Sequence, residues 1–123
     1  MAYQMLDHGQ YVEFRLHGLV LGVDLPGPEW YRRIVVCGRL LLDATDVERV
    51  EADILWMAGF ARSVQLLGPF RTAVVAPSPV VFGTFRQALA YRGDLPHPAP
   101  VEFFRARELA VAWLLEPGDS AAG

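Results

Sequence analysis

The chain contains no lysine; all of its 11 basic side chains are arginine. This absence excludes a Schiff-base lysine, the lysine of a phosphate-binding loop and the lysine of a phospho-receiver site. The formal net charge is −3, so a broad surface for nucleic-acid phosphates is not expected. The sequence therefore predicts neither a lysine-dependent enzyme of these kinds nor a nucleic-acid partner.

Cysteine and histidine are also scarce. Cys37 is the only cysteine, which excludes an internal disulfide and fits a reducing compartment. It falls at the C-terminal end of an expected helix, where the helix dipole disfavours a thiolate, so we interpret it as a core residue. The three histidines, His8, His17 and His97, are too dispersed for metal-ligand spacing. The histidines therefore predict no shared metal site.

Long apolar runs are absent as well. The longest uncharged stretch, Thr72–Phe85, is too short for a membrane helix and contains Pro77 and Pro79. Met1–Gln10 lacks the basic stretch followed by an apolar run that marks a secretory signal. We therefore expect a cytoplasmic protein without membrane insertion.

Apolar residues, in contrast, make up 53% of the 123 residues, which is ample for one core. This share is slightly high for a small monomer, so it also favours a protein partner or self-association as a homodimer. We assign residues 1–115 to one domain. Residues 116–123 contain no apolar side chain larger than alanine and are predicted to be a disordered tail.

Alternation and helical spacing predict five strands and four helices. The expected strands cover Tyr3–Leu6, Gln10–His17, Arg39–Asp43, Arg71–Ala76 and Val101–Arg105. The expected helices begin near residues 28, 54, 79 and 107, and glycines or the start of the tail follow them. In the second strand, Val12, Phe14 and Leu16 would face the core, while Glu13, Arg15 and His17 would face water.

The order β-β-α-β-α-β-α-β-α indicates an α/β fold with a mixed four- to five-stranded sheet and covering helices. Right-handed crossovers would make the later strands parallel, with the first hairpin strand antiparallel to them. Asp46–Glu51 would be a polar connection, and Leu109 and Trp113 would anchor the last helix at i, i+4 spacing. Leu19–Leu21 could extend the sheet or form an apolar loop.

Two stretches carry a family resemblance. Arg71–Pro77 followed by Val81-Phe82-Gly83, and Val101–Arg105 leading into Glu108–Leu114, resemble the strand-to-helix steps of the STAS fold in its SpoIIAA-like branch. The similarity covers Tyr3–Leu115. It implies a regulatory, non-enzymatic module that acts through protein interaction and needs no cofactor. Some members of this branch have an apolar pocket between sheet and helices, which implies a lipid-like ligand as the alternative function.

In the anti-sigma-factor antagonists of this superfamily, a serine at the start of the second helix is phosphorylated, within the motif Asp-Ser-Ser-Gly. The matching stretch here is Glu51-Ala52-Asp53-Ile54, which contains neither serine. The phosphorylation switch is therefore not carried over. Asp53 either imitates the charge of a phosphoserine or caps the helix.

An acidic stretch follows the third expected strand, at the edge where open α/β sheets place their sites. Its carboxylates, with Thr45, could hold Mg²⁺, form a partner-facing patch or lie in a solvated loop. Ser78, at the next strand-to-helix junction, could bind an anion or cap its helix. The candidate partner-binding or regulatory residues are Asp43, Thr45, Asp46, Glu51, Ala52, Asp53 and Ser78.

Large aromatic residues on the expected helix faces suggest either ordinary core packing or a cleft for an apolar ligand. Leu19–Leu25 would serve as the lid of such a cleft. The candidate pocket residues are Leu21, Trp30, Phe82 and Phe85. No catalytic residue is predicted, because no serine or cysteine is paired with a histidine by any recognisable spacing.

Overall fold

The fold begins with a β-hairpin. The computed structural model describes residues 3–20, 28–51 and 53–117. In it, β1 (Tyr3–Asp7) pairs antiparallel with β2 (Val12–Val20), with Tyr3 opposite Leu16. The backbone N–H of Gly9 donates to the Asp7 carboxylate at 2.8 Å, and Gly9 has a φ of +85°. The aspartate and the glycine thus make the turn that the sequence predicts.

Three parallel strands extend this hairpin. β3 (Arg39–Val50), β4 (Arg71–Val75) and β5 (Val101–Phe104) add in chain order, so the sheet runs β1-β2-β3-β4-β5. The helices are α1 (Pro28–Cys37), α2 (Ile54–Gln65), α3 (Pro79–Ala90) and α4 (Arg107–Leu114). The predicted α/β fold with a mixed five-stranded sheet is confirmed.

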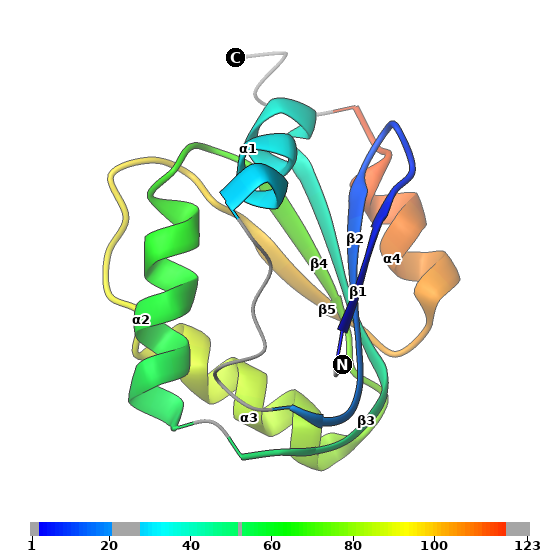
Figure 1. The fold of residues 1–123 in the computed structure, drawn as a ribbon, viewed down its shortest axis with the longest axis vertical. Helices are drawn as coiled ribbons and strands as arrows, with labels where there is room; N and C mark the ends of the chain where they lie inside the picture. The colour runs from blue at the N-terminus through cyan, green and yellow to red at the C-terminus, as the bar shows by residue number, and fades with distance from the viewer. Residues whose placement is uncertain (1–2, 21–27, 52, 118–123) are drawn as a thin grey trace.

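The helices divide unequally between the two faces of the sheet. Each of α1, α2 and α3 connects two neighbouring parallel strands, and right-handed crossovers that advance in one direction place their helices on one face. α4 follows the last strand and lies on the opposite side (Figure 1). We call these sides the three-helix face and the single-helix face.

Each face has its own apolar core. On the three-helix face, Val12, Phe14 and Leu16 pack with Ile34 of α1, as the alternation in β2 predicts. The single-helix face has a smaller core of described residues: Tyr11, Leu41, Ala73, Val75, Ala110 and Leu114. Most of the apolar burial therefore occurs under α1, α2 and α3.

The contacts of α4 differ from the expectation. Leu109 is 61% exposed, whereas Ala110 and Leu114 are fully buried. Alanines at positions 73 and 110 allow the helix to approach the sheet closely, which turns position 109 outward. Trp113 packs at the margin, and the Arg71 guanidinium lies 4.8 Å from the centre of its ring. The predicted anchor at Leu109 is wrong.

The third strand is longer than expected. Asp46–Glu51 was expected to be a connection, but β3 continues to Val50 and pairs with β2 along Asp46↔His17 and Val50↔Val20. The backbone supplies this pairing despite the poor alternation, with register shifts at Arg15/His17 and Gly18/Leu19. Leu19 and Val20 therefore extend the sheet, while Leu21 lies outside the described residues.

Candidate functional site

The acidic candidates do not converge. Asp43 and Asp46 belong to β3, and Glu51 follows it, so the stretch from residue 43 to residue 51 spans about 26 Å of extended chain. Asp46 is exposed, and Glu51 is exposed in an ion pair with Arg49 at 2.8 Å. Within the described ranges, no three acidic, histidine or cysteine side chains group to hold a metal ion. The geometry thus does not favour the magnesium alternative.

Asp53 and Ser78 both cap helices. The Asp53 carboxylate accepts a hydrogen bond from the backbone N–H of Leu55 at 3.3 Å, at the start of α2. The Ser78 hydroxyl accepts from the N–H of Val81 at 3.5 Å, at the start of α3. These contacts confirm the helix-capping interpretation of both residues. Ala52 lies outside the described residues.

The outward face of α2 is unusually apolar. Leu55 in the first turn and Leu66 and Leu67 at the C-terminal end are 66%, 45% and 54% exposed. Arg62 is the one charged residue between positions 54 and 65. The opposite side of α2 is also apolar, packs against α3 and faces the sheet across a cavity. A helix that is apolar all round is normally buried, so this face is suited to cover by another surface.

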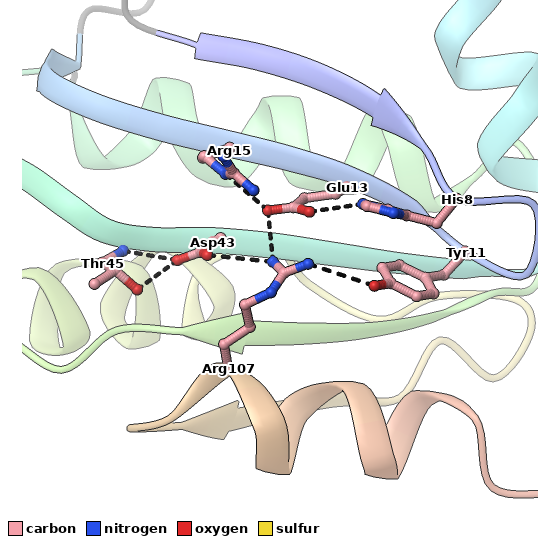
Figure 2. A network of polar contacts seen from close by, with 7 residues as sticks. All are labelled: His8, Tyr11, Glu13, Arg15, Asp43, Thr45 and Arg107. Atoms are coloured by element: carbon pink, nitrogen blue, oxygen red, sulfur yellow. Dashed lines mark hydrogen bonds and ion pairs between the residues drawn. The ribbon is translucent and has the colours of Figure 1, made fainter.

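A buried carboxylate occupies the single-helix face (Figure 2). Glu13 of β2 is fully buried and its two oxygens accept from three side chains. His8 Nε2 lies 2.8 Å from Oε1, while Arg15 Nε and Arg107 Nη1 lie 3.0 and 2.6 Å from Oε2. Three cationic or imidazole groups thus compensate one carboxylate, and Arg107 ties α4 to β2.

Asp43 and Thr45 extend this network along β3. Arg107 Nη1 also lies 3.5 Å from Asp43 Oδ2. The other oxygen of Asp43 accepts from the Thr45 N–H at 3.0 Å and from its hydroxyl at 2.5 Å. The hydroxyl of Tyr11 lies 3.4 Å from Arg107 Nη2. Two of the sequence candidates therefore belong to a structural network beneath the N-terminus of α4, as Figure 2 shows.

The network keeps Glu13 ionised. Burial alone would raise the pKa of Glu13, but the hydrogen bonds from Arg107, Arg15 and His8 outweigh it and lower the pKa. The hydrogen bond to Glu13 raises the pKa of Arg107. A carboxylate held ionised by three donors is a poor proton acceptor at neutral pH, so the cluster is suited to fastening elements together.

Glu13 and Arg107 are absent from the sequence candidates. The alternation in β2 places the Glu13 side chain on the other face of the strand from Val12 and Phe14, and we expected it to face water. That expectation is wrong because Arg107, 94 residues later in the chain, covers it. Arg15, two residues away on the same side of the strand, is the one local signal for a polar pair.

A cavity lies on the three-helix face between the sheet and the helices. Its volume is about 150 Å³, and its described lining is apolar except for polar side chains such as Gln65 and Thr72. Phe85, one of the pocket candidates, is among the lining residues. Trp56 also lines it and stacks on Phe60 with ring centres 5.6 Å apart. The cavity can hold a small apolar molecule.

The other pocket candidates lie elsewhere. Trp30 packs at the margin of the core, and Phe82 lines a separate groove between α3 and β5, where its ring meets that of Phe103 at 5.1 Å. Leu21 and most of the expected lid fall outside the described residues. None of the helices in the described ranges has the length and apolar character needed to cross a bilayer.

Among known proteins, the chain resembles solved structures in its fold. No family model matches the chain, and a comparison with curated proteins finds no match. An uncharacterised protein of the DUF3478 family with a SpoIIAA-like fold, from Shewanella loihica PV-4, is 19% identical over 92% of each chain, with a TM-score of 0.50. The anti-sigma factor antagonist SpoIIAA in its unphosphorylated form is 15% identical over 94% of this chain and 100% of that one, with a TM-score of 0.57.

At these identities the similarity concerns the fold. Both structures share the α/β arrangement described above, as the resemblance in the two strand-to-helix stretches predicts. The chain therefore has a SpoIIAA-like fold.

Proposed function

We propose that this protein is a protein-interaction module without catalytic activity of its own, and that the outward face of α2 is its contact surface. The observation that carries the proposal is that α2 is apolar on both sides, with Leu55 66% exposed. The fold likeness to an anti-sigma factor antagonist supports a regulatory role of this kind.

The position of this face supports the same proposal. It begins at Asp53, where the family resemblance places the regulated serine of the antagonists. Asp53 gives its N-terminal end a negative charge, and Glu51, which is paired with Arg49, lies exposed beside it. A partner surface that pairs apolar residues with nearby basic side chains would complement it.

A photo-cross-linking residue at position 55 tests the proposal in cells of the source organism. The matched control carries the same residue at position 109, which is 61% exposed in the first turn of α4 on the other face. We expect a protein cross-linked through position 55 and none through 109. Equal capture at both positions, or none at 55, would contradict the proposal.

The acidic end can be tested separately. Asn also caps helices well, so Asp53→Asn removes the charge and keeps the cap. We expect Asp53→Asn combined with Glu51→Gln to reduce the cross-linking yield at position 55. An unchanged yield would exclude the acidic end from the contact surface.

The cavity favours a second candidate function, binding of a small apolar ligand. An apolar cavity of about 150 Å³ is known to accept benzene, and the cavity here has that volume. Its size fits one ring or a short acyl chain better than a complete lipid. Ligand-observed NMR with benzene and octanoate tests this function. We expect Ala61→Leu, which adds carbon atoms to the lining, to abolish binding and the exposed Ala112→Leu to retain it.

A further inference from the structure

Gly59 lies on the outward face of α2, in the middle of the helix. A Cβ atom built at this position meets nothing within 4 Å, and its backbone is not left-handed. Glycine in an exposed helix interior destabilises the helix relative to alanine. The packing and the backbone of the chain leave Gly59 unexplained, as they do Gly83 of α3. Gly59, however, lies between the exposed Leu55 and Leu66, where the missing side chain leaves room for another backbone.

The charges at the two ends of α2 identify what approaches. Glu51 and Asp53 lie at its N-terminal end. At its C-terminal end, the Arg62 guanidinium donates to the backbone carbonyls of Arg92 and Asp94, and Arg92 donates to Gln65 at 2.7 Å. Because Glu51 is paired with Arg49 at 2.8 Å, Asp53 supplies the net negative charge at one end. The other end carries two guanidinium groups and one acid, Asp94, so two antiparallel copies of this helix are complementary at both ends.

The position of Gly59 has the symmetry that such a pair requires. The helix covers residues 54–65, so its midpoint falls next to Gly59. A twofold axis at this point overlaps the two helices along their full length and places position 53 of one copy level with position 66 of the other. We propose that α2 pairs with α2 of a second copy of this chain, antiparallel, with the helices crossing at Gly59. This pairing rests on the proposed function and names its partner.

In this arrangement, Leu55 and Leu66 of each copy cover the partner's helix on either side of the crossing. Acidic Glu51 and Asp53 approach the partner's Arg62 and Arg92. The small side chain of Ser63, which lies exposed one turn after Gly59, leaves room for the partner backbone. The interface is isologous, so the same residues serve both copies.

Sedimentation velocity on the full chain, from about 1 µM to about 1 mM, tests the dimer. We expect a concentration-dependent dimer that Leu55→Glu weakens at least about tenfold. Glutamate in the first helical turn favours the helix, so this variant is expected to fold. The matched control is Leu109→Glu, also in a first turn and similarly exposed. A monomer throughout, or equal weakening by the control, would overturn the proposal.

The crossing point has its own test. Gly59→Ala is expected to raise the melting temperature of the monomer and to weaken the dimer, two effects that purely structural roles do not combine. Gly83→Ala in α3 is the control, because a Cβ there also meets nothing within 4 Å. We expect the control to raise the melting temperature without changing association. Equal weakening of the dimer by both variants would show that the helices do not cross at Gly59.

Disulfide trapping distinguishes the antiparallel arrangement. In a Cys37→Ser background, a mixture of Asp53→Cys and Leu66→Cys chains should cross-link, and neither variant should cross-link alone. Cross-linking of either variant alone, or none in the mixture, would overturn the arrangement. If the protein is a monomer, the pairing of two copies is wrong, but the proposed function is not. The cross-linking at position 55 then tests the proposed function, and capture of a different protein there would support it.

Discussion

The two faces of the sheet are stabilised in different ways. The three-helix face has a large apolar core and encloses a cavity of about 150 Å³. The single-helix face has a small core and a fully buried Glu13 bound by three side chains. On the first face, stability comes from many weak apolar contacts; on the second, it depends on a few directed ones.

This difference follows from the connectivity. The crossovers supply α1, α2 and α3 to one face, and the other receives α4, which packs on β3, β4 and β5. The polar network around Glu13 lies where α4 meets the middle of the sheet (Figure 2). A short helix with a small apolar contact thus gains a fixed position from Arg107 at its N-terminus and Arg71 at its C-terminus.

Removal of Arg107 should have the largest effect. Arg107→Ala removes the nearest partner of buried Glu13 but leaves Arg15 and His8, so the loss of this charged hydrogen bond should cost about 1.5–3 kcal/mol. The free energy of unfolding in urea, followed by circular dichroism, measures this loss. The control is Arg49→Ala, which breaks the exposed pair with Glu51 and should cost less than about 1 kcal/mol. Equal losses would mean that the two faces do not differ as described.

The same network should make stability depend on acid. Hydrogen bonds lower the pKa of Glu13 in the folded state, so its stabilisation is present above the pKa of the unfolded chain. It is lost as the pH falls from about 4.5, the ordinary glutamate range, through the lower pKa of the folded protein. Urea unfolding across this range should give a shallower pH dependence in Glu13→Gln.

Asp7 contributes in the same direction. Its pKa is lowered by the hydrogen bond from Arg33, so some acid sensitivity should remain in the Glu13→Gln variant. An unchanged slope in that variant would show that Glu13 titrates alike in the folded and unfolded chains.

The three-helix face should respond to added volume. Ala61→Leu places carbon atoms in the cavity and should stabilise the protein by about 1 kcal/mol, because filling a void restores dispersion contacts. Thermal unfolding, with exposed Ala112→Leu as the control, measures the change. A loss of stability would indicate that the cavity walls cannot accommodate the added carbons.

The helix caps should have the smallest effects. Ser78→Ala and Asp53→Ala each remove one capping acceptor and should cost about 0.5–1 kcal/mol in urea unfolding. Asp53→Asn keeps the acceptor and should change the free energy of unfolding by only about 0.3 kcal/mol. A large loss in Asp53→Asn would assign a structural role to the charge itself.

The sequence was sufficient for the order of elements, because alternation in β2, buried runs in β4 and helix-capping residues are local signals. It was misleading for Asp46–Glu51, where pairing with β2 extends a polar segment as a strand. It was also misleading for Glu13, whose burial depends on a helix at the other end of the chain. For the proposed contact surface, it offered Asp53 and Glu51 as candidates but gave no signal for the exposed apolar face of α2.

The long separation between Glu13 and Arg107 has a consequence for how the chain folds. The strands add in chain order, so each new strand meets an edge that already exists and the sheet can grow as the chain is synthesised. The contact between Glu13 and Arg107 spans 94 residues and can form only once Arg107, which follows the last strand, has been synthesised. Until α4 docks, the Arg107 side chain does not cover Glu13, so we expect its carboxylate to be accessible to water. Docking of α4 therefore completes the domain. We expect chains shortened before residue 107 to form a less stable sheet whose single-helix face stays uncovered.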